Sequence, residues 1–121
     1  MKLYVIKDNL SLRRALKEMH VDMSREQLDE GCFFHCKLVF SELASNAAKH
    51  TKEGGSIGVE IFDERVEITL TCAQPVLLPD RSSCSSVYEE SGRGLYLIDS
   101  VCESRERTEN GGWKVVVSRI K

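Results

Sequence analysis

Two stretches before residue 50 carry apolar side chains at the period of an α-helix. After a short predicted strand at residues 3–6, the first helix begins near Asn9. Its apolar face consists of Leu12, Ala15, Leu16 and Met19. Ser24 and Gln27 have the spacing of a capping box, so they predict the start of a second, longer helix, which ends near His50 before a glycine stop. The apolar stripe of this second helix consists of Cys32, Cys36, Val39, Leu43 and Ala47.

The period changes to two after residue 55, which predicts β-strands. Residues 56–62 and 66–70 alternate apolar and polar side chains on either side of a tight turn, and this pattern predicts a hairpin with one buried face. A second hairpin is predicted from residues 105–108 and 113–120, joined by the turn Glu-Asn-Gly-Gly.

A segment without a sustained period lies between the two hairpins. Residues 73–91 contain both prolines of the chain, and loops of this length in compact domains are often functional lids. The helical period then returns at Leu95, Ile98, Val101 and Cys102. The order of elements predicts one α+β domain over residues 1–121. Its expected architecture is a two-layer sandwich of a mixed, mostly antiparallel sheet with helices on one face.

The charges of the chain are balanced and dispersed. Seventeen basic and nineteen acidic side chains give a formal charge of -2, and neither sign forms a block. This composition argues against direct nucleic-acid binding and against an anionic membrane as partner. No apolar stretch approaches the length of a membrane span, and the N-terminus resembles a strand more than a signal peptide, so we expect a cytoplasmic protein.

The cysteines are expected to be reduced. There are five of them, an odd number, and they lack the spacing of a disulfide framework. Cys32, His35 and Cys36 form a cluster that could suggest a metal site. They lie in an apolar helical run without a second ligand pair, so packing in the core is the favoured interpretation.

Three polar side chains recur every four residues along the second helix. Glu42, Asn46 and His50 therefore lie on one helical face. Glu42 could orient or deprotonate a water or hydroxyl, and the amide oxygen of Asn46 could bind Mg²⁺ beside phosphate oxygens. A solvated helix face is the alternative. The stripe borders the apolar positions Leu43 and Ala47, which places it at the edge of the core. A polar group there costs free energy unless it has a partner, so a function for the stripe is favoured.

A glycine-rich turn precedes the third predicted helix. Gly92 and Gly94 flank Arg93, and free backbone N–H groups at a helix start attract anions. The arginine would add a charge-assisted donor. The same glycines could simply shape the turn, and both interpretations stay open at this point.

Taken together, the two motifs resemble the nucleotide-binding domain of the GHKL ATPase superfamily. They are Glu-x-x-x-Asn-Ala-x-x-His on a helix and, after a hairpin and a lid, Ser-Gly-Arg-Gly-Leu opening another helix. Among its members, the anti-sigma factor serine/threonine kinases resemble this chain in length and element order from end to end. The run Asn-Ala-Ala-Lys-His-Thr also resembles the same box of histidine kinase catalytic domains.

The resemblance implies roles for individual residues and names their ligands, ATP and Mg²⁺. Glu42 would activate the attacking group, and Asn46 would coordinate Mg²⁺. Lys49 and His50 would lie near the phosphates. The second glycine box, which contacts the phosphates as the lid closes, would consist of Gly92, Arg93, Gly94 and Leu95.

The resemblance also implies protein partners. They would be a sigma factor or an anti-sigma antagonist, and members of the family often form homodimers.

The chain departs from the family pattern where the adenine is bound. An Asp-x-Gly-x-Gly box is expected after the strand at residues 66–70, but Cys72 and Gln74 stand at its aspartate and first glycine positions. A thiol is a poor hydrogen-bond acceptor for an adenine amino group.

Two hypotheses follow from the motifs and this departure. The first is an ATP-dependent regulatory kinase that binds a protein partner. The second is a non-catalytic relative with weak or lost nucleotide binding. A histidine kinase module fits less well, because His20 and His35 lack a phospho-acceptor context.

Overall fold

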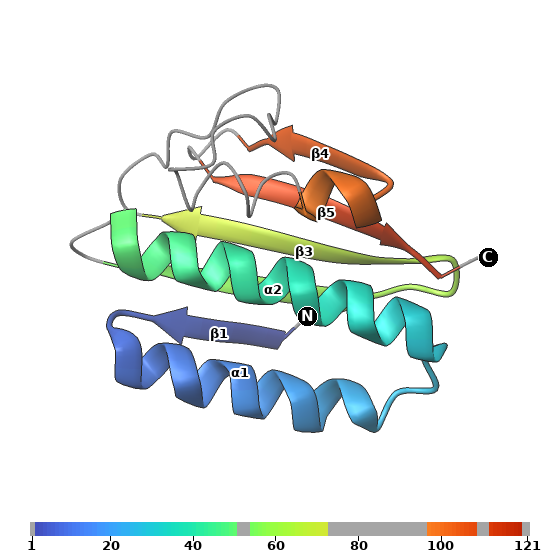
Figure 1. Cartoon of the computed structure of the whole chain (residues 1–121), viewed down its shortest axis with the longest axis horizontal. Helices are drawn as coiled ribbons and strands as arrows, with labels where there is room; N and C mark the ends of the chain where they lie inside the picture. Colours follow the sequence, from blue (N-terminus) through green and yellow to red (C-terminus); the bar gives the residue numbers. More distant parts are fainter. Residues whose placement is uncertain (1, 51–53, 73–96, 109–111, 120–121) are drawn as a thin grey trace.

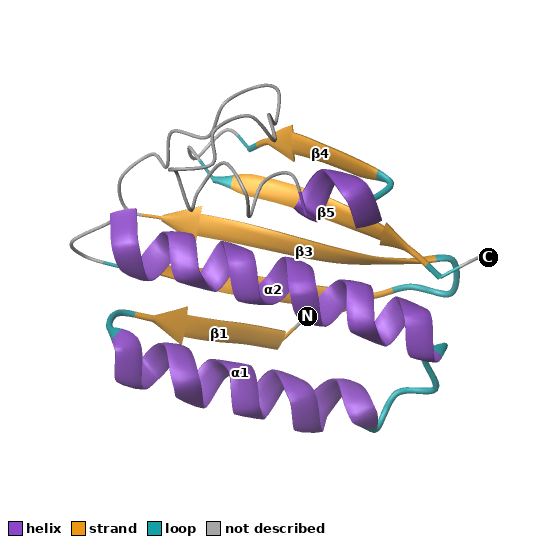
Figure 2. Ribbon diagram, viewed as in Figure 1, coloured by secondary structure: helices purple, strands orange, loops and turns teal. Residues whose placement is uncertain are grey.

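A computed structural model describes residues 2–50, 54–72, 97–108 and 112–119. The elements are β1 (Lys2–Ile6), α1 (Asn9–Ser24), α2 (Glu30–His50), β2 (Gly55–Ile61), β3 (Arg65–Cys72), β4 (Ser104–Arg107) and β5 (Trp113–Ser118). A helical segment at residues 97–101 precedes β4. Figures 1 and 2 show the helices packed as one layer against a single twisted sheet. The predicted helices and both predicted hairpins are confirmed within the described residues.

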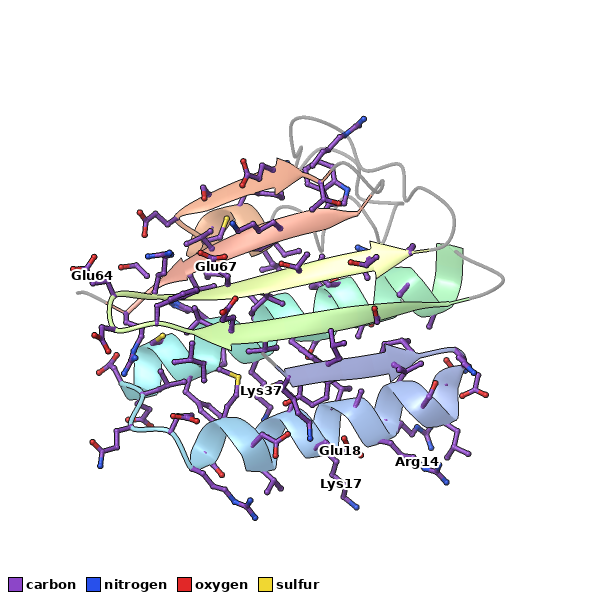
Figure 3. All side chains as sticks on the ribbon, turned by 180° about the vertical axis from the view of Figure 1, so that it is seen from behind. Arg14, Lys17, Glu18, Lys37, Glu64 and Glu67 are labelled. Carbon is purple, nitrogen blue, oxygen red and sulfur yellow. The ribbon has the colours of Figure 1, made fainter. Side chains whose placement is uncertain are left out.

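The five described strands form one sheet in the order β1-β2-β3-β5-β4. Every neighbouring pair among them is antiparallel, so this part of the chain contains no parallel pair of the mixed sheet that was expected. Seen from behind in Figure 3, the strands lie in front of the helices, and one sheet face carries no helix within the described residues. The fold is therefore α+β with its helices on one face, as predicted.

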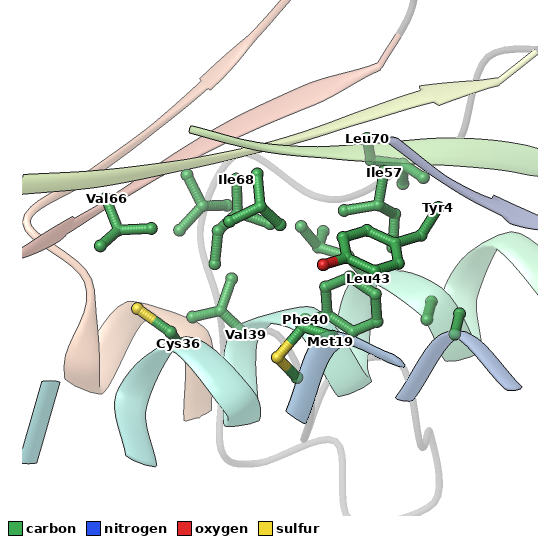
Figure 4. Close-up of a cluster of buried hydrophobic side chains, with 14 of the residues drawn as sticks. Tyr4, Met19, Cys36, Val39, Phe40, Leu43, Ile57, Val66, Ile68 and Leu70 are labelled. Atoms are coloured by element: carbon green, nitrogen blue, oxygen red, sulfur yellow. The ribbon is translucent and has the colours of Figure 1, made fainter. Parts of the chain in front are cut away.

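The core lies between α2 and the inner face of the sheet (Figure 4). The predicted apolar stripe of α2 is confirmed, because all five of its members are buried. They pack against alternate residues of the two central strands, namely Ile57, Val66, Ile68 and Leu70. Full burial of one such side chain stabilises the fold by about 1.5–3 kcal/mol. The rings of Tyr4 and Phe40 pack edge to face with their centres 5.1 Å apart, which connects β1 to α2.

Each of the two long helices begins at an aspartate cap. Asp8 accepts a hydrogen bond from the Ser11 backbone N–H at 2.8 Å, and Ser11 Oγ accepts from the Asp8 N–H in return, which completes a capping box on α1. At the start of α2, Asp29 Oδ2 accepts from the N–H groups of Gly31 and Cys32.

The prediction that Ser24 and Gln27 cap the second helix is wrong. Ser24 is the last residue of α1, and its hydroxyl donates to the Val21 carbonyl oxygen. Burial of Met23 carries α1 through this position, so the chain turns later and uses Asp29 instead.

Two consecutive glycines bring the chain from α2 back into the sheet. Gly54 has a φ of 74°, and a Cβ atom there would lie 2.0 Å from the Ile6 carbonyl oxygen. A Cβ atom on Gly55 would lie 2.7 Å from the Thr71 carbonyl oxygen and 2.8 Å from Cys72 Sγ. The ends of β1 and β3 and the start of β2 are therefore packed tightly together at one end of the sandwich.

Candidate functional site

The candidate site lies at this end of the sandwich. The chain needs only residues 51–54 to pass from the end of α2 to the start of β2. The antiparallel register then places Cys72, the last residue of β3, opposite Gly55. The last turns of α2 and the end of β3 consequently reach the same edge of the molecule, as Figure 1 shows. The two motif positions Asn46 and Cys72 are brought to one region by this connection.

Asn46 is the most informative of the predicted site residues. Its side chain is only 4% exposed, and it is the one buried polar residue among those that the structure describes. Within the same residues, Asn46 Nδ2 has no hydrogen-bond partner. A buried amide without a partner costs about 1–3 kcal/mol of stability. Asn46 is thus more deeply buried than the edge position that the sequence predicted.

Asn46 lies on the flank of α2 that is turned away from α1. On the other flank, the centres of the Phe33 ring and of the His20 ring of α1 lie 5.3 Å apart. At 100° per residue, Asn46 projects about 140° from Phe33. His35, which projects within about 20° of Asn46, lines a cavity of about 310 Å³ together with Val101. This flank therefore faces the part of the helical layer that includes residues 97–101.

Glu42 lies on the same flank, one turn before Asn46. Its side chain is half-buried, and it already takes part in an interaction within the protein. The predicted pairing of an acid and an amide on one helical face is confirmed by the helix that carries both residues. Glu42 could act as a proton acceptor beside a ligand held by Asn46, because residues four apart on a helix are neighbours.

Cys72 supplies a neutral thiol to this end of the sheet. It is 6% exposed, and burial raises the pKa of its thiol above the ordinary value. The thiol therefore stays protonated at neutral pH. A protonated thiol offers only a weak donor and a weak acceptor, unlike the carboxylate that the family pattern places there.

The sequence did not single out a tryptophan whose ring lies close to two arginines of β4. Trp113 of β5 pairs with Leu70 of β3, which lies two residues before Cys72 on the same face of the sheet. The guanidinium carbons of Arg105 and Arg107 lie 4.6 Å and 5.4 Å from the centre of its ring. Two arginines separated by one residue in a strand must share a face, and that spacing is the sequence signal that could have revealed the group.

Arg105 is tied to the helical segment at residues 97–101. Its side chain is 7% exposed, and Nε donates to Asp99 Oδ1 at 2.9 Å while Nη2 donates to Asp99 Oδ2 at 3.3 Å. A bidentate pair of this kind fixes orientation as well as charge. The pair anchors this segment to β4 beside the candidate site.

Several predicted site residues lie outside the described part of the chain. Lys49 and His50 belong to the last turn of α2, but their side chains are not described. The expected lid at residues 73–91 and Gln74 also lie outside the described residues. The same holds for the second glycine box, Gly92, Arg93, Gly94 and Leu95.

The two cysteines of the Cys-x-x-His-Cys motif belong to the core. Cys32 and Cys36 are both buried, and their sulfur atoms lie 4.0 Å apart. Burial raises the pKa of both thiols, most strongly that of Cys36. This agrees with the interpretation that the two cysteines pack as small hydrophobic residues.

Comparisons with known proteins leave the family of the chain open. No protein-family model matches it, and no curated protein matches it either. Among the described residues, none of the helices has the length and apolar character needed to cross a membrane.

Proposed function

We propose that this chain is an ATP-binding regulatory protein of the anti-sigma factor serine/threonine kinase type, with a GHKL or histidine kinase-like fold. It binds Mg-ATP at the end of the sandwich and a regulatory protein partner elsewhere, in the cytoplasm. The single observation that carries the proposal is Asn46, a buried amide without a partner among the described residues, at the motif position. The helical layer on one face of an antiparallel sheet supports the same assignment.

The residues present fit a magnesium ion. Rotation of the Asn46 side chain can present either its oxygen or its nitrogen, and a neutral amide oxygen is a ligand that Mg²⁺ accepts beside phosphate oxygens. Asn46 would hold the ion, which when bound neutralises charge on the phosphates of ATP. Glu42 would accept a proton from the attacking hydroxyl. In the full proposal, Lys49, His50 and the glycine box at residues 92–95 would bind the phosphates.

Cys72 favours the alternative, a non-catalytic module of the same fold with weak or lost nucleotide binding. A neutral, buried thiol cannot replace a carboxylate that accepts a hydrogen bond from adenine. Loss of such a contact weakens discrimination between bases by orders of magnitude. The alternative keeps the protein partner and removes the phosphoryl transfer.

Calorimetric titration with ATP, with and without Mg²⁺, tests the proposal. We expect micromolar binding that requires Mg²⁺ in the wild-type protein and in Glu42→Ala, and loss of this Mg²⁺-dependent binding in Asn46→Ala. Asn9→Ala removes an exposed amide from α1 and is the matched control, which should bind like wild type. Undetectable ATP binding by the wild-type protein would support the non-catalytic alternative. Binding that is indifferent to both Mg²⁺ and Asn46→Ala would refute the assigned role of Asn46.

A further inference from the structure

A groove with an apolar floor and a basic rim lies on the outer surface of the helical layer. It is an open hollow of about 590 Å³ over residues 10–20 of α1 and Lys37 of α2, and it starts at Leu10, near the end of the sandwich that carries Cys72. Leu10 and Leu16 contribute its apolar surface. The rim of this basic groove consists of Arg13, Arg14 and Lys17 from α1 and Lys37 from α2.

The charge of the basic groove is one-sided. No aspartate or glutamate lines it, although the whole chain carries a formal charge of -2. On the sheet, by contrast, Arg65 and Lys114 both form ion pairs with Glu67. None of the four rim cations lies within ion-pair distance of a carboxylate of the described residues. The pKa of the nearby Asp8 carboxyl is lowered mainly by hydrogen bonds from Ser11 and to a smaller extent by the charge of Arg14. Arg14 and Lys17, labelled in Figure 3, extend into solvent from α1.

The apolar part of the basic groove is also unusual for a free surface. Leu10 is 59% exposed, and Leu16 is only half-buried. An apolar strip bordered by charges of one sign is typical of a protein-binding surface. The concave shape between two helices fits a third helix, whose apolar side chains would enter the groove.

We propose that the basic groove binds an acidic amphipathic helix of a partner protein. Leucine-like side chains of that helix would cover Leu10 and Leu16, and its carboxylates would meet the four rim cations. Charge complementarity of this kind raises the association rate and selects against basic partners. A membrane surface fits less well, because the groove is concave and the exposed apolar residues of α1, Leu10 and Val21, are few. The proposal does not depend on nucleotide binding.

The test uses a fluorescein-labelled helical peptide with leucine at positions 1, 4, 8 and 11 and glutamate on both flanks. An otherwise identical peptide with lysine in place of glutamate is the specificity control. Fluorescence anisotropy should show that the acidic peptide binds the wild-type chain and the basic peptide does not. The affinity should fall with added salt, because the rim is exposed to solvent.

Two double variants separate the groove from net charge. Arg13→Glu with Lys17→Glu reverses two rim charges, whereas Lys7→Glu with Arg25→Glu makes the same charge change at exposed positions outside the groove. We expect the rim variant to weaken peptide binding at least about tenfold and the control variant at most about twofold. Far-UV circular dichroism verifies that both variants remain folded.

Three results would overturn the proposal. The first is a wild-type chain that does not bind the acidic peptide. The second is an equal loss of peptide affinity in both double variants, which would show that net charge alone accounts for the binding. The third is that the wild-type chain and the control variant sediment with vesicles of 70% phosphatidylcholine and 30% phosphatidylserine, whereas the rim variant does not. The groove would then bind a lipid surface.

Discussion

Replacing Asn46 with leucine should stabilise the protein, although almost all substitutions at buried positions destabilise. Asn46 is 4% exposed, and its Nδ2 has no hydrogen-bond partner among the described residues. Leucine has a similar size and shape and carries no group that needs a partner. Because its neighbours Leu43 and Ala47 are buried and apolar, the new side chain meets surroundings that suit it.

The size of the effect follows from the desolvation of the amide. A buried donor without a partner costs about 1–3 kcal/mol, and this cost disappears in Asn46→Leu. Imperfect packing of the leucine side chain offsets part of this stabilisation, because core substitutions of similar volume cost up to about 1.5 kcal/mol. We therefore expect the free energy of unfolding to rise by about 1–2 kcal/mol. For a chain of this length the midpoint of thermal unfolding should rise by roughly 3–10 °C.

Urea unfolding followed by tryptophan fluorescence measures this change directly. Trp113 is the only tryptophan of the chain and is 3% exposed, so its emission reports the loss of the core. The slope of the free energy against urea concentration should stay constant, which shows that the variant unfolds from an equally compact state. Asn9→Leu makes the same change at an exposed position and should stay within about 0.5 kcal/mol of wild type.

A loss of more than about 1 kcal/mol of unfolding free energy in Asn46→Leu would contradict this expectation. It would mean that the amide makes a hydrogen bond in the folded protein and that its burial costs nothing. Asn46 would then have no unpartnered amide to offer a ligand.

Three further predictions concern other parts of the molecule. The Arg65 guanidinium, which donates to Glu67 at 2.7 Å, lowers the pKa of that carboxyl below its ordinary value. The stability that this carboxylate contributes is therefore present above the ordinary pKa of a glutamate and is lost as the pH falls through the lowered pKa. Urea unfolding at pH 7 and pH 3 should show a smaller loss for Glu67→Gln than for wild type, and an equal loss would contradict this. Gly55→Ala should cost about 1–3 kcal/mol in the same assay at pH 7, because its Cβ would lie 2.8 Å from Cys72 Sγ; an unchanged midpoint would exclude the close approach. Burial raises the pKa of Cys36, so iodoacetamide should modify that thiol, as read by mass spectrometry, much more slowly in the native protein than in urea, and equal rates would contradict its place in the core.

Local hydrophobic periods were sufficient to predict the helices and hairpins. The buried positions of α2 recur at the helical period, and those of β3 alternate strictly at Val66, Ile68 and Leu70. These patterns depend on neighbours in the chain. The start of α2 was missed because serine and aspartate cap helices equally well, and the choice between Ser24 and Asp29 depends on the burial of Met23 in the assembled core.

The candidate site depends on contacts that are distant in the sequence. The pairing of β5 with β3 brings Trp113 opposite Leu70, and the pairing of β4 with β5 then places Arg107 beside the ring. The pairing of β4 with β5 is the second hairpin that the local sequence predicted, whereas the pairing of β5 with β3 has no local sequence signal. The sequence identified Asn46 from its spacing alone and placed it at the edge of the core, because the depth of a flank residue depends on how closely the neighbouring elements approach.

Stability and binding measured on the same variant can distinguish the two proposed functions. A folded domain has only about 5–15 kcal/mol of net stability, so a buried amide that costs about 1–3 kcal/mol is a considerable burden. If the amide binds Mg-ATP, Asn46→Leu must gain stability in the absence of nucleotide and lose the stabilisation that Mg-ATP gives to the wild-type protein. If the chain is a non-catalytic relative, the same substitution gains stability, and Mg-ATP shifts the unfolding midpoint of neither protein. Because both proteins are compared with and without Mg-ATP in one assay, the outcome depends on the site and not on the general tolerance of the core.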